Sequence, residues 1–311
     1  MASIETNLSR RPHWSSSADS SAEFDVTPAR YTAIKHILAY VDGTENDRAV
    51  LDHALEVARR FISHIDVLHV RFDAGRGYEP YLDRLLDLPV ERAIAEAATR
   101  ACRHFEDWQV QRKLPLREGG PAISGPSTLW REIVGYENEV VAQLGRLSDL
   151  IVMGRPNERS ISSSLMALET ALFDTCRPVL MVPNSEPANL FHRPLIAWNG
   201  SLEAARAVGF ALPFLVECEG GVDVFAAPEP KHHTATGELL RYLRWHGIPA
   251  ERISVEDSRP IGVSLLAHAT ANNAGLIVMG AYTHGHYRQF LFGGVTRHVM
   301  HYACTTVLLA H

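Results

Sequence analysis

The chain has 311 residues, of which 46% are hydrophobic and 21% are charged, so it is long and apolar enough to form about two globular domains. This composition excludes a collagen, a coiled coil or a globally disordered chain, and no apolar run reaches the length of a membrane span. The net charge is −6, from 30 basic and 36 acidic side chains, which argues against broad binding to nucleic acid or to an anionic membrane.

The first part of the chain predicts a polar tail followed by alternating strands and helices. Residues 1–30 are serine-rich and lack apolar periodicity, so we expect a tail there. The predicted elements are a strand at 34–41, a helix at 47–61, a strand at 65–70, a long helix at 85–111, a strand at 130–134, a helix at 137–146, a strand at 149–154, a helix at 164–174 and a strand at 178–182. Strand, helix and strand in this order imply parallel pairs with right-handed crossovers.

After a polar linker at 183–187, the pattern repeats. The run LIVMG at 150–154 recurs without change at 276–280, 126 residues later. Two further anchors keep the same order: residues 38–44 match 195–201 at an offset of 157, and Cys176 and Val179 match Cys304 and Val307 at an offset of 128. Three anchors in one order indicate a duplication. The first copy carries 31 extra residues between its first strand and LIVMG, which the long helix at 85–111 and its loop account for.

The duplication predicts an α/β protein with two tandem open parallel sheets, each of the Rossmann-like kind. We place the first domain at 31–187 and the second at 188–311. The last strands of the two copies, Val179–Val182 and Thr306–Leu309, have edges that need cover, and we expect them to pair.

The turns after the first strand and after LIVMG are the places to look for function, because open α/β sheets bind ligands beyond the carboxyl ends of their strands. In the second copy, residues 280–296 hold two glycine-bearing segments, and a helix is expected to begin near Gly294. A helix N-terminus offers unpaired N–H donors, and glycine lets a phosphate approach the backbone. The loop is either a phosphate cradle or glycine-rich for turn geometry alone, and its composition leaves both readings open.

Over about residues 31–311, the chain resembles a tandem universal stress protein. The sequence segments that carry the resemblance are Gly-Ala-Tyr at 280–282, Phe-Gly-Gly-Val-Thr-Arg at 292–297 and Ala-Trp-Asn-Gly-Ser at 197–201. The nucleotide-binding members carry an acidic residue after the first strand. After the fourth strand they carry a glycine, two residues, a glycine, nine residues, and a glycine followed by a small residue.

The resemblance implies the adenine nucleotide alpha hydrolase-like fold, an intramolecular pseudo-dimer of the two copies, and a site for ATP or a related adenine nucleotide with Mg²⁺. The implied nucleotide-binding residues are Asn199, Gly280, Thr283, Gly293, Gly294 and Thr296. Asn199 would face the ribose or adenine, and the others would surround the phosphates. Two of them depart from the family pattern. Asn199 replaces an aspartate, and Thr283 replaces a glycine, at a cost of roughly 1–2 kcal/mol if that position needs a left-handed backbone.

The first copy departs further from this pattern. Asp42 keeps the acidic residue and Gly154 the first glycine, but Leu165 and Met166 stand where Gly293 and Gly294 have their counterparts. We expect these bulky side chains to occupy the phosphate space, so the first copy should be structural. Arg155 and Arg159 could hold an anion, but a solvated basic loop is the simpler interpretation.

Other residues carry weaker signals. Three histidine pairs, at 232–233, 284/286 and 298/301, lack the neighbouring ligands of a metal site, so we expect no metal. Trp198 either lines the nucleotide pocket or packs on the sheet, and packing is favoured. The four cysteines form no CxxC pair and no apolar export segment begins the chain, so a cytoplasmic protein is expected.

Together these observations favour a stress-response factor that binds an adenine nucleotide as a sensor or regulator. We expect no fast enzyme, although a slow ATPase stays open. The expected partner is the nucleotide, and a second copy of the chain is a further candidate. The alternatives are a scaffold of the same fold without nucleotide, and a hydrolase or transferase built on the same sheet.

Overall fold

The computed structural model describes residues 34–73, 88–120, 125–156, 163–226, 233–253, 259–281 and 294–311. All of them belong to one compact unit, Thr32–His311. The tail expected at 1–30 lies outside the described residues.

The first half of this unit consists of β1 (His36–Tyr40), α1 (Asp47–Phe61), β2 (His64–Phe72), α2 (Leu88–Arg112), β3 (Ser127–Gly135), α3 (Glu137–Gly145), β4 (Leu150–Gly154), α4 (Ser163–Asp174) and β5 (Val179–Val182). The second half consists of β6 (Leu195–Trp198), α5 (Leu202–Val216), β7 (Val222–Ala226), α6 (His233–Trp245), β8 (Ala250–Ile253), α7 (Ile261–Ala271), β9 (Leu276–Gly280), α8 (Gly294–Tyr302) and β10 (Thr306–Ala310). The predicted order of strands and helices is confirmed, with most ends shifted by a few residues.

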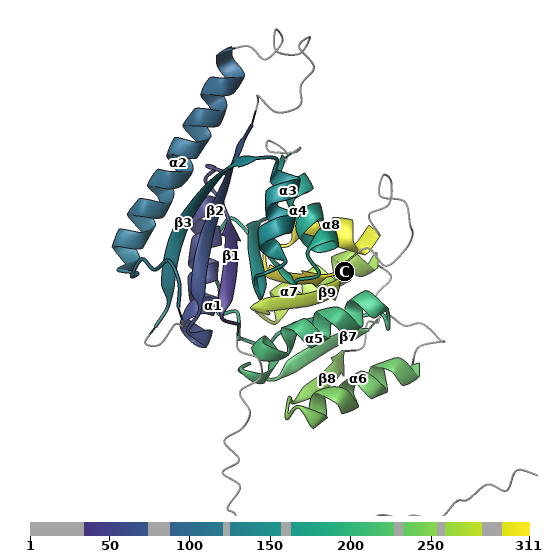
Figure 1. Cartoon of the computed structure of the whole chain (residues 1–311). Helices are drawn as coiled ribbons and strands as arrows, with labels where there is room; N and C mark the ends of the chain where they lie inside the picture. Colours follow the sequence, from purple (N-terminus) through teal and green to yellow (C-terminus); the bar gives the residue numbers. More distant parts are fainter. Residues whose placement is uncertain are drawn as a thin grey trace, which may run out of the picture. The chain divides into compact units, whose positions relative to one another are not determined.

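The ten strands form one sheet in the order β3-β2-β1-β4-β5-β10-β9-β6-β7-β8. The order of the second half repeats that of the first in reverse, which is the pattern of a pseudo-dimer within one chain (Figure 1). Strands pair in parallel within each half, whereas β5 and β10 pair antiparallel, with Val179 opposite Leu309 and Met181 opposite Val307. The expected fold class and the expected pairing of the two last strands are confirmed.

Helices cover both faces of the sheet. One apolar core lies under α1, α2, α5 and α6 and includes Leu51, Trp108, Phe214 and Leu243. The other lies under α3, α4, α7 and α8 and includes Leu168 and Val299 among others. Because the central strands are buried on both faces, their sequences read as continuous apolar runs such as LIVMG.

The antiparallel junction sets the direction of each half. The strands of the first half run opposite to those of the second half, because β5 and β10 run in opposite directions. The carboxyl ends of the first-half strands therefore lie at one end of the strand direction, and those of the second-half strands lie at the other end. Any ligand sites beyond those ends lie at opposite ends as well.

The long helix expected in the first half is present and holds 12 of its extra residues. The helix α2 has 25 residues, whereas α6 at the same place in the second half has 13. Among the described residues, no helix is long and apolar enough to cross a membrane.

The duplication extends to a buried carboxylate in each half. Asp66 in β2 and Asp223 in β7 are 157 residues apart in the chain, the offset that relates the first strands of the two copies. Both are buried. Asp66 lies 3.2 Å from Nε2 of His36, 3.1 Å from Nε2 of His64 and 2.9 Å from Nη1 of Arg131. Burial alone would raise the pKa of Asp66, but the hydrogen bonds from these three side chains outweigh it and hold the pKa well below its usual range.

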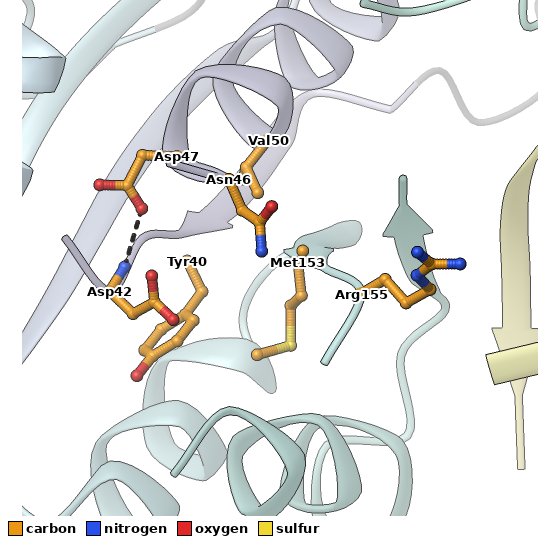
Figure 2. A pocket seen from close by; sticks show the side chains of 8 residues that line it. Tyr40, Asp42, Asn46, Asp47, Val50, Met153 and Arg155 are labelled. Atoms are coloured by element: carbon orange, nitrogen blue, oxygen red, sulfur yellow. Dashed lines mark hydrogen bonds between the residues drawn. The ribbon is translucent and has the colours of Figure 1, made fainter. Parts of the chain in front are cut away.

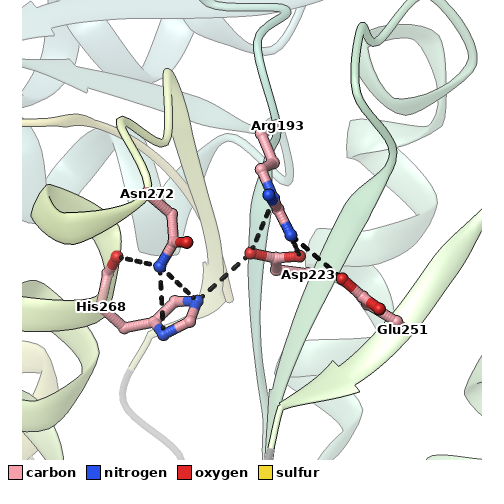
Figure 3. Close-up of polar contacts among 5 residues, drawn as sticks. All are labelled: Arg193, Asp223, Glu251, His268 and Asn272. Atoms are coloured by element: carbon pink, nitrogen blue, oxygen red, sulfur yellow. Dashed lines mark hydrogen bonds and ion pairs between the residues drawn. The ribbon is translucent and has the colours of Figure 1, made fainter.

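The second half surrounds its carboxylate differently. Figure 3 shows Asp223 between Arg193 and His268, whose Nε and Nε2 atoms each lie 3.2 Å from the carboxylate. Arg193 stands 157 residues after His36, so an arginine replaces that histidine. Arg193 also contacts Glu251 at 3.0 Å, and Asn272 donates to the backbone carbonyl of His268. Each half therefore neutralises the same buried charge with different side chains.

Replacing Asp66 by asparagine is expected to lower the free energy of unfolding by about 2 kcal/mol at pH 7, because three donors lose their charged acceptor. His36 and Arg131 are about one-third exposed, so the loss should be smaller than for a fully buried pair. The pKa of Asp66 is lower in the folded than in the unfolded state, so wild-type stability should decline as the pH falls below about 4. Urea unfolding at pH 7 and at pH 3 measures both effects. Equal pH dependence in wild type and Asp66→Asn would contradict this account.

Candidate functional site

The second half has its candidate site where the chain paths of two neighbouring strands diverge. The strands β6 and β9 pair in parallel, with Ile196 opposite Val278 and Ala197 opposite Met279. From β6 the chain continues to β7 on one side, and from β9 it continues to β10 on the other. This divergence is the topological switch point at which open α/β sheets bind their ligands. We call the region beyond these two strand ends the second-half site.

The turn after β6 is held by its own side chains. Asn199 is exposed, and its Oδ1 accepts the N–H of Ser201 at 3.1 Å. Gly200 between them has φ +75°, which favours glycine. Ser201 caps α5, since its Oγ accepts the N–H of Ala204 at 3.1 Å. Asn199 therefore occupies an ordered turn at the edge where the nucleotide ribose was expected.

Gly280 ends β9 directly against the first turn of α5. A Cβ atom on Gly280 would lie 2.5 Å from the backbone nitrogen of Ala204 and 2.6 Å from the carbonyl carbon of Glu203. Glycine is thus required here for close packing of strand and helix, whether or not a phosphate approaches. The contact also brings the end of β9 next to the turn that carries Asn199.

The helix expected near Gly294 begins there. Gly294 is exposed, and a Cβ atom built on it would meet no atom of the described residues within 4 Å. Thr296 lies in the first turn of α8 and is buried. The open space over Gly294 suits an approaching anion, which the N–H groups of a first helical turn attract. Thr283 and Gly293 lie outside the described residues.

The first half has an equivalent site beyond β1 and β4, but its cavity is small. It measures about 20 Å³ and is lined by Tyr40, Asp42, Asn46, Asp47, Val50, Met153, Gly154 and Arg155 (Figure 2). A cavity of this size holds about one water molecule. This space is much smaller than a nucleotide, and the structural role expected of the first half stays a prediction.

Asp47 organises the turn at this first-half site. Its Oδ1 accepts the N–H of Asp42 at 3.0 Å, and its Oδ2 accepts the N–H of Gly43 at 3.1 Å. Nδ1 of His104 in α2 lies 2.9 Å from the same Oδ2. Burial raises the pKa of Asp47 to about 6, although the hydrogen bonds from His104 and the backbone oppose the rise. The acidic residue expected to matter was Asp42, and sequence reasoning missed Asp47.

The long helix α2 covers the same turn. A Cβ atom on Gly43 would lie 2.4 Å from the backbone oxygen of Ala97, and Gly43 has φ +81°. Nε of Arg100 donates to the backbone oxygen of Gly43 at 3.0 Å. The inserted helix therefore lies directly on the turn after β1. The extra 31 residues of the first copy were the only sequence signal for this contact.

One expectation about the first half stays a prediction, and another needs correction. Leu165 and Met166 were expected to fill the phosphate space. The helix α4 begins at Ser163, Leu165 packs against the core and Met166 is about half exposed, which leaves that expectation untested. Arg155 was expected in a solvated basic loop. Instead its Nη1 donates to the backbone oxygens of His301 at 3.1 Å and Ala303 at 2.9 Å. Arg159 lies outside the described residues.

The comparisons with known proteins agree with this architecture. The model of the universal stress protein family matches residues 33–167 and 226–311. The chain belongs to the universal stress protein family. A universal stress protein from Archaeoglobus fulgidus superimposes with a TM-score of 0.62 at 18% identity, covering 88% of this chain and 97% of that one. A putative universal stress protein from Pseudomonas aeruginosa has a TM-score of 0.52 at 15% identity, covering 89% and 93%. No curated protein matches the sequence.

The family model matches some of the candidate site residues of this universal stress protein and leaves others unmatched. The second matched segment, 226–311, includes Gly280, Gly294 and Thr296. Asn199 and its turn fall in the unmatched part between the two segments. The likeness to the solved structures, all below 25% identity, shows the fold and leaves the ligand open.

Two other sequence features have definite surroundings. Trp198 packs against the core on the α5 side of the sheet, as favoured, although its Nε1 is buried and has no hydrogen-bond partner among the described residues. His298 lies against α7, where a Cβ on Gly262 would come within 3.1 Å of its side chain, and its ring is 4.8 Å from that of Tyr302. Within the described ranges, no group of three His, Cys, Asp or Glu side chains could hold a metal ion.

The two LIVMG strands of this universal stress protein are expected to differ in their tolerance of a methyl group. Gly280→Ala should lower the free energy of unfolding by about 2 kcal/mol, because its Cβ would overlap the backbone of α5. The matched variant Gly154→Ala should change stability by less than about 0.5 kcal/mol, since its Cβ would lie 3.4 Å from Cβ of Asn46, an ordinary contact. Urea unfolding of both variants measures the difference. A similar loss in both would show that packing does not explain Gly280.

Proposed function

We propose that this universal stress protein binds an adenine nucleotide, ATP or a relative, at the second-half site and acts as a sensor or regulator in the cytoplasm. The observation that carries the proposal is the open N-terminus of α8 at Gly294, which follows the loop that leaves the switch point between β6 and β9. The helix dipole and unpaired N–H groups there favour the negative charge of a phosphate.

The remaining residues suit the other parts of a nucleotide. Asn199 is exposed on its ordered turn and offers an amide to a ribose hydroxyl or an adenine nitrogen. Gly280 brings the two turns together through its contact with α5. Thr296 adds a hydroxyl in the first turn of α8, and Thr283 and Gly293 belong to the proposed phosphate loop. Mg²⁺ would bind with the phosphates.

The proposed site supports binding better than fast catalysis. Its residues offer one side-chain amide, two hydroxyls and the backbone N–H groups of three glycines. These groups supply hydrogen bonds but no general base. Any hydrolysis of ATP by this set of residues should be slow.

The first experiment asks whether the protein holds a nucleotide at all. Purified full-length protein is denatured, and the released small molecules are separated by chromatography. Adenine nucleotide at up to one molecule per chain is expected, because the first-half cavity of about 20 Å³ has no room for a second. Thermal unfolding with added Mg-ATP should show a higher midpoint, since a ligand that binds only the folded state stabilises it. If no nucleotide is released and no shift appears, the protein is a scaffold of this fold without nucleotide.

A second experiment tests the helix N-terminus. Gly294→Ala should weaken ATP binding about tenfold, because its methyl group would occupy the space proposed for a phosphate. The fold should tolerate the change, since the Cβ meets nothing within 4 Å. Gly209→Ala in α5 is the matched control, because its Cβ also meets nothing. Titration calorimetry with ATP gives both affinities. Unchanged affinity in Gly294→Ala would contradict the placement of the phosphates.

A further inference from the structure

Arg155 connects the two halves through the last turn of α8. It follows β4 in the first half, and its Nη1 donates to the backbone oxygens of His301 and Ala303 at the end of α8 in the second half. Figure 2 shows the guanidinium pointing away from Asp42 and Asn46, although Arg155 lines the same cavity. The charge of this arginine is therefore directed to the helix end.

The direction of the strands explains how this contact arises. The helix α8 follows β9 and precedes β10, which pair in parallel, so it runs back across the sheet and ends at the opposite edge. That edge holds the carboxyl ends of the first-half strands, because β5 and β10 are antiparallel. Arg155, directly after β4, thus meets the last turn of α8.

The backbone of Arg155 is fixed to the central strands. Its N–H donates to the backbone oxygen of Val182 at the end of β5 at 2.9 Å. Ala281 makes the equivalent bond to Ala310 at the end of β10, at 2.8 Å. The two residues are therefore counterparts, and only the first half carries an arginine there. Arg155 therefore gives the end of α8 a charged partner. Its counterpart Ala281 has no side chain that could do the same for the end of α4.

The helix needs such a partner because it is short. It has nine residues, and no acidic residue lies in its first turn. Helices of this length are marginal on their own. Its buried Val299 and Met300 pack into the apolar core on that face of the protein. A cation at the last carbonyls satisfies unpaired acceptors and complements the helix dipole.

We propose that Arg155 is a positioning residue for the nucleotide site: by holding the last turn of α8, it sets the place and order of the first turn, where the phosphates are proposed to bind. This inference rests on the proposed function. The nine residues of α8 span roughly 13 Å, so Arg155 acts through the helix and does not touch the nucleotide. The first half, whose own cavity is too small for nucleotide, would thereby complete the site of the second half.

Hydrogen exchange on the ligand-free full-length protein is the first test. In Arg155→Met, the amides of residues 294–303 should exchange at least about fivefold faster than in wild type, because the last turn opens more often. Arg155→Lys keeps the charge and should restore most of the protection. Unchanged exchange over α8 in Arg155→Met would overturn the proposal, whatever the protein binds.

Affinity for ATP and for adenosine is the second test. Arg155→Met should weaken ATP binding about fivefold and leave adenosine binding nearly unchanged, because only the phosphates meet the first turn of α8. Arg155→Lys should recover most of the ATP affinity. Equal losses for ATP and adenosine would indicate a general loosening of the fold and would overturn the positioning role.

The matched control is Arg146→Met. Nε of Arg146 donates to the backbone oxygen of Asp174, so it meets the end of α4, the counterpart of α8 in the first half. This variant should leave ATP affinity and the exchange of α8 unchanged. If wild type binds no adenine nucleotide, the proposed function fails and the positioning role fails with it. If wild type binds and Arg155→Met binds equally well, only the inference about Arg155 is wrong.

Discussion

The antiparallel pair of β5 and β10 is the interaction on which the rest of the structure depends. Each half is an open parallel sheet, and an open sheet leaves a row of unpaired backbone groups at its edge. The pairing of Val179–Val182 with the last strand satisfies these groups in both halves and buries both strands. It also places the two switch points at opposite ends of the strands. A ligand cannot be shared between them.

Within this arrangement, the two sites follow the same duplicated strands but differ in the steric contacts of their turns. In the first half, the backbone of α2 lies on Gly43, and the remaining cavity holds little more than a water molecule. In the second half, the close contact is instead between Gly280 and the first turn of α5, and no atom of the described part of the chain lies within 4 Å of a Cβ on Gly294. The inserted helix thus adds a contact at the turn after β1, while the first-half cavity itself is lined by residues of β1, α1 and the end of β4.

The sequence was sufficient for the fold because its signals are local and repeated. The LIVMG strands, the order of the three anchors and the extra residues of the first copy predict the strands, the duplication and the long helix. Contacts made by single side chains across the sheet were not predictable in this way. Asp66 and Asp223 share the offset of 157, which could have revealed them, but nothing in the sequence places Arg155 against a helix that ends 147 residues later. That contact exists only because the central strands run antiparallel.

This geometry gives the first half two contributions to the second half that do not depend on a ligand site of its own. A single second half would leave β10 with an unpaired edge and the last carbonyls of α8 without a cation. The first half supplies both, through β5 and through Arg155 directly after β4. Neither contribution needs a cavity at the first-half switch point, so α2 can lie on Gly43 without loss to them. The first half can therefore support the second half through these two contacts alone.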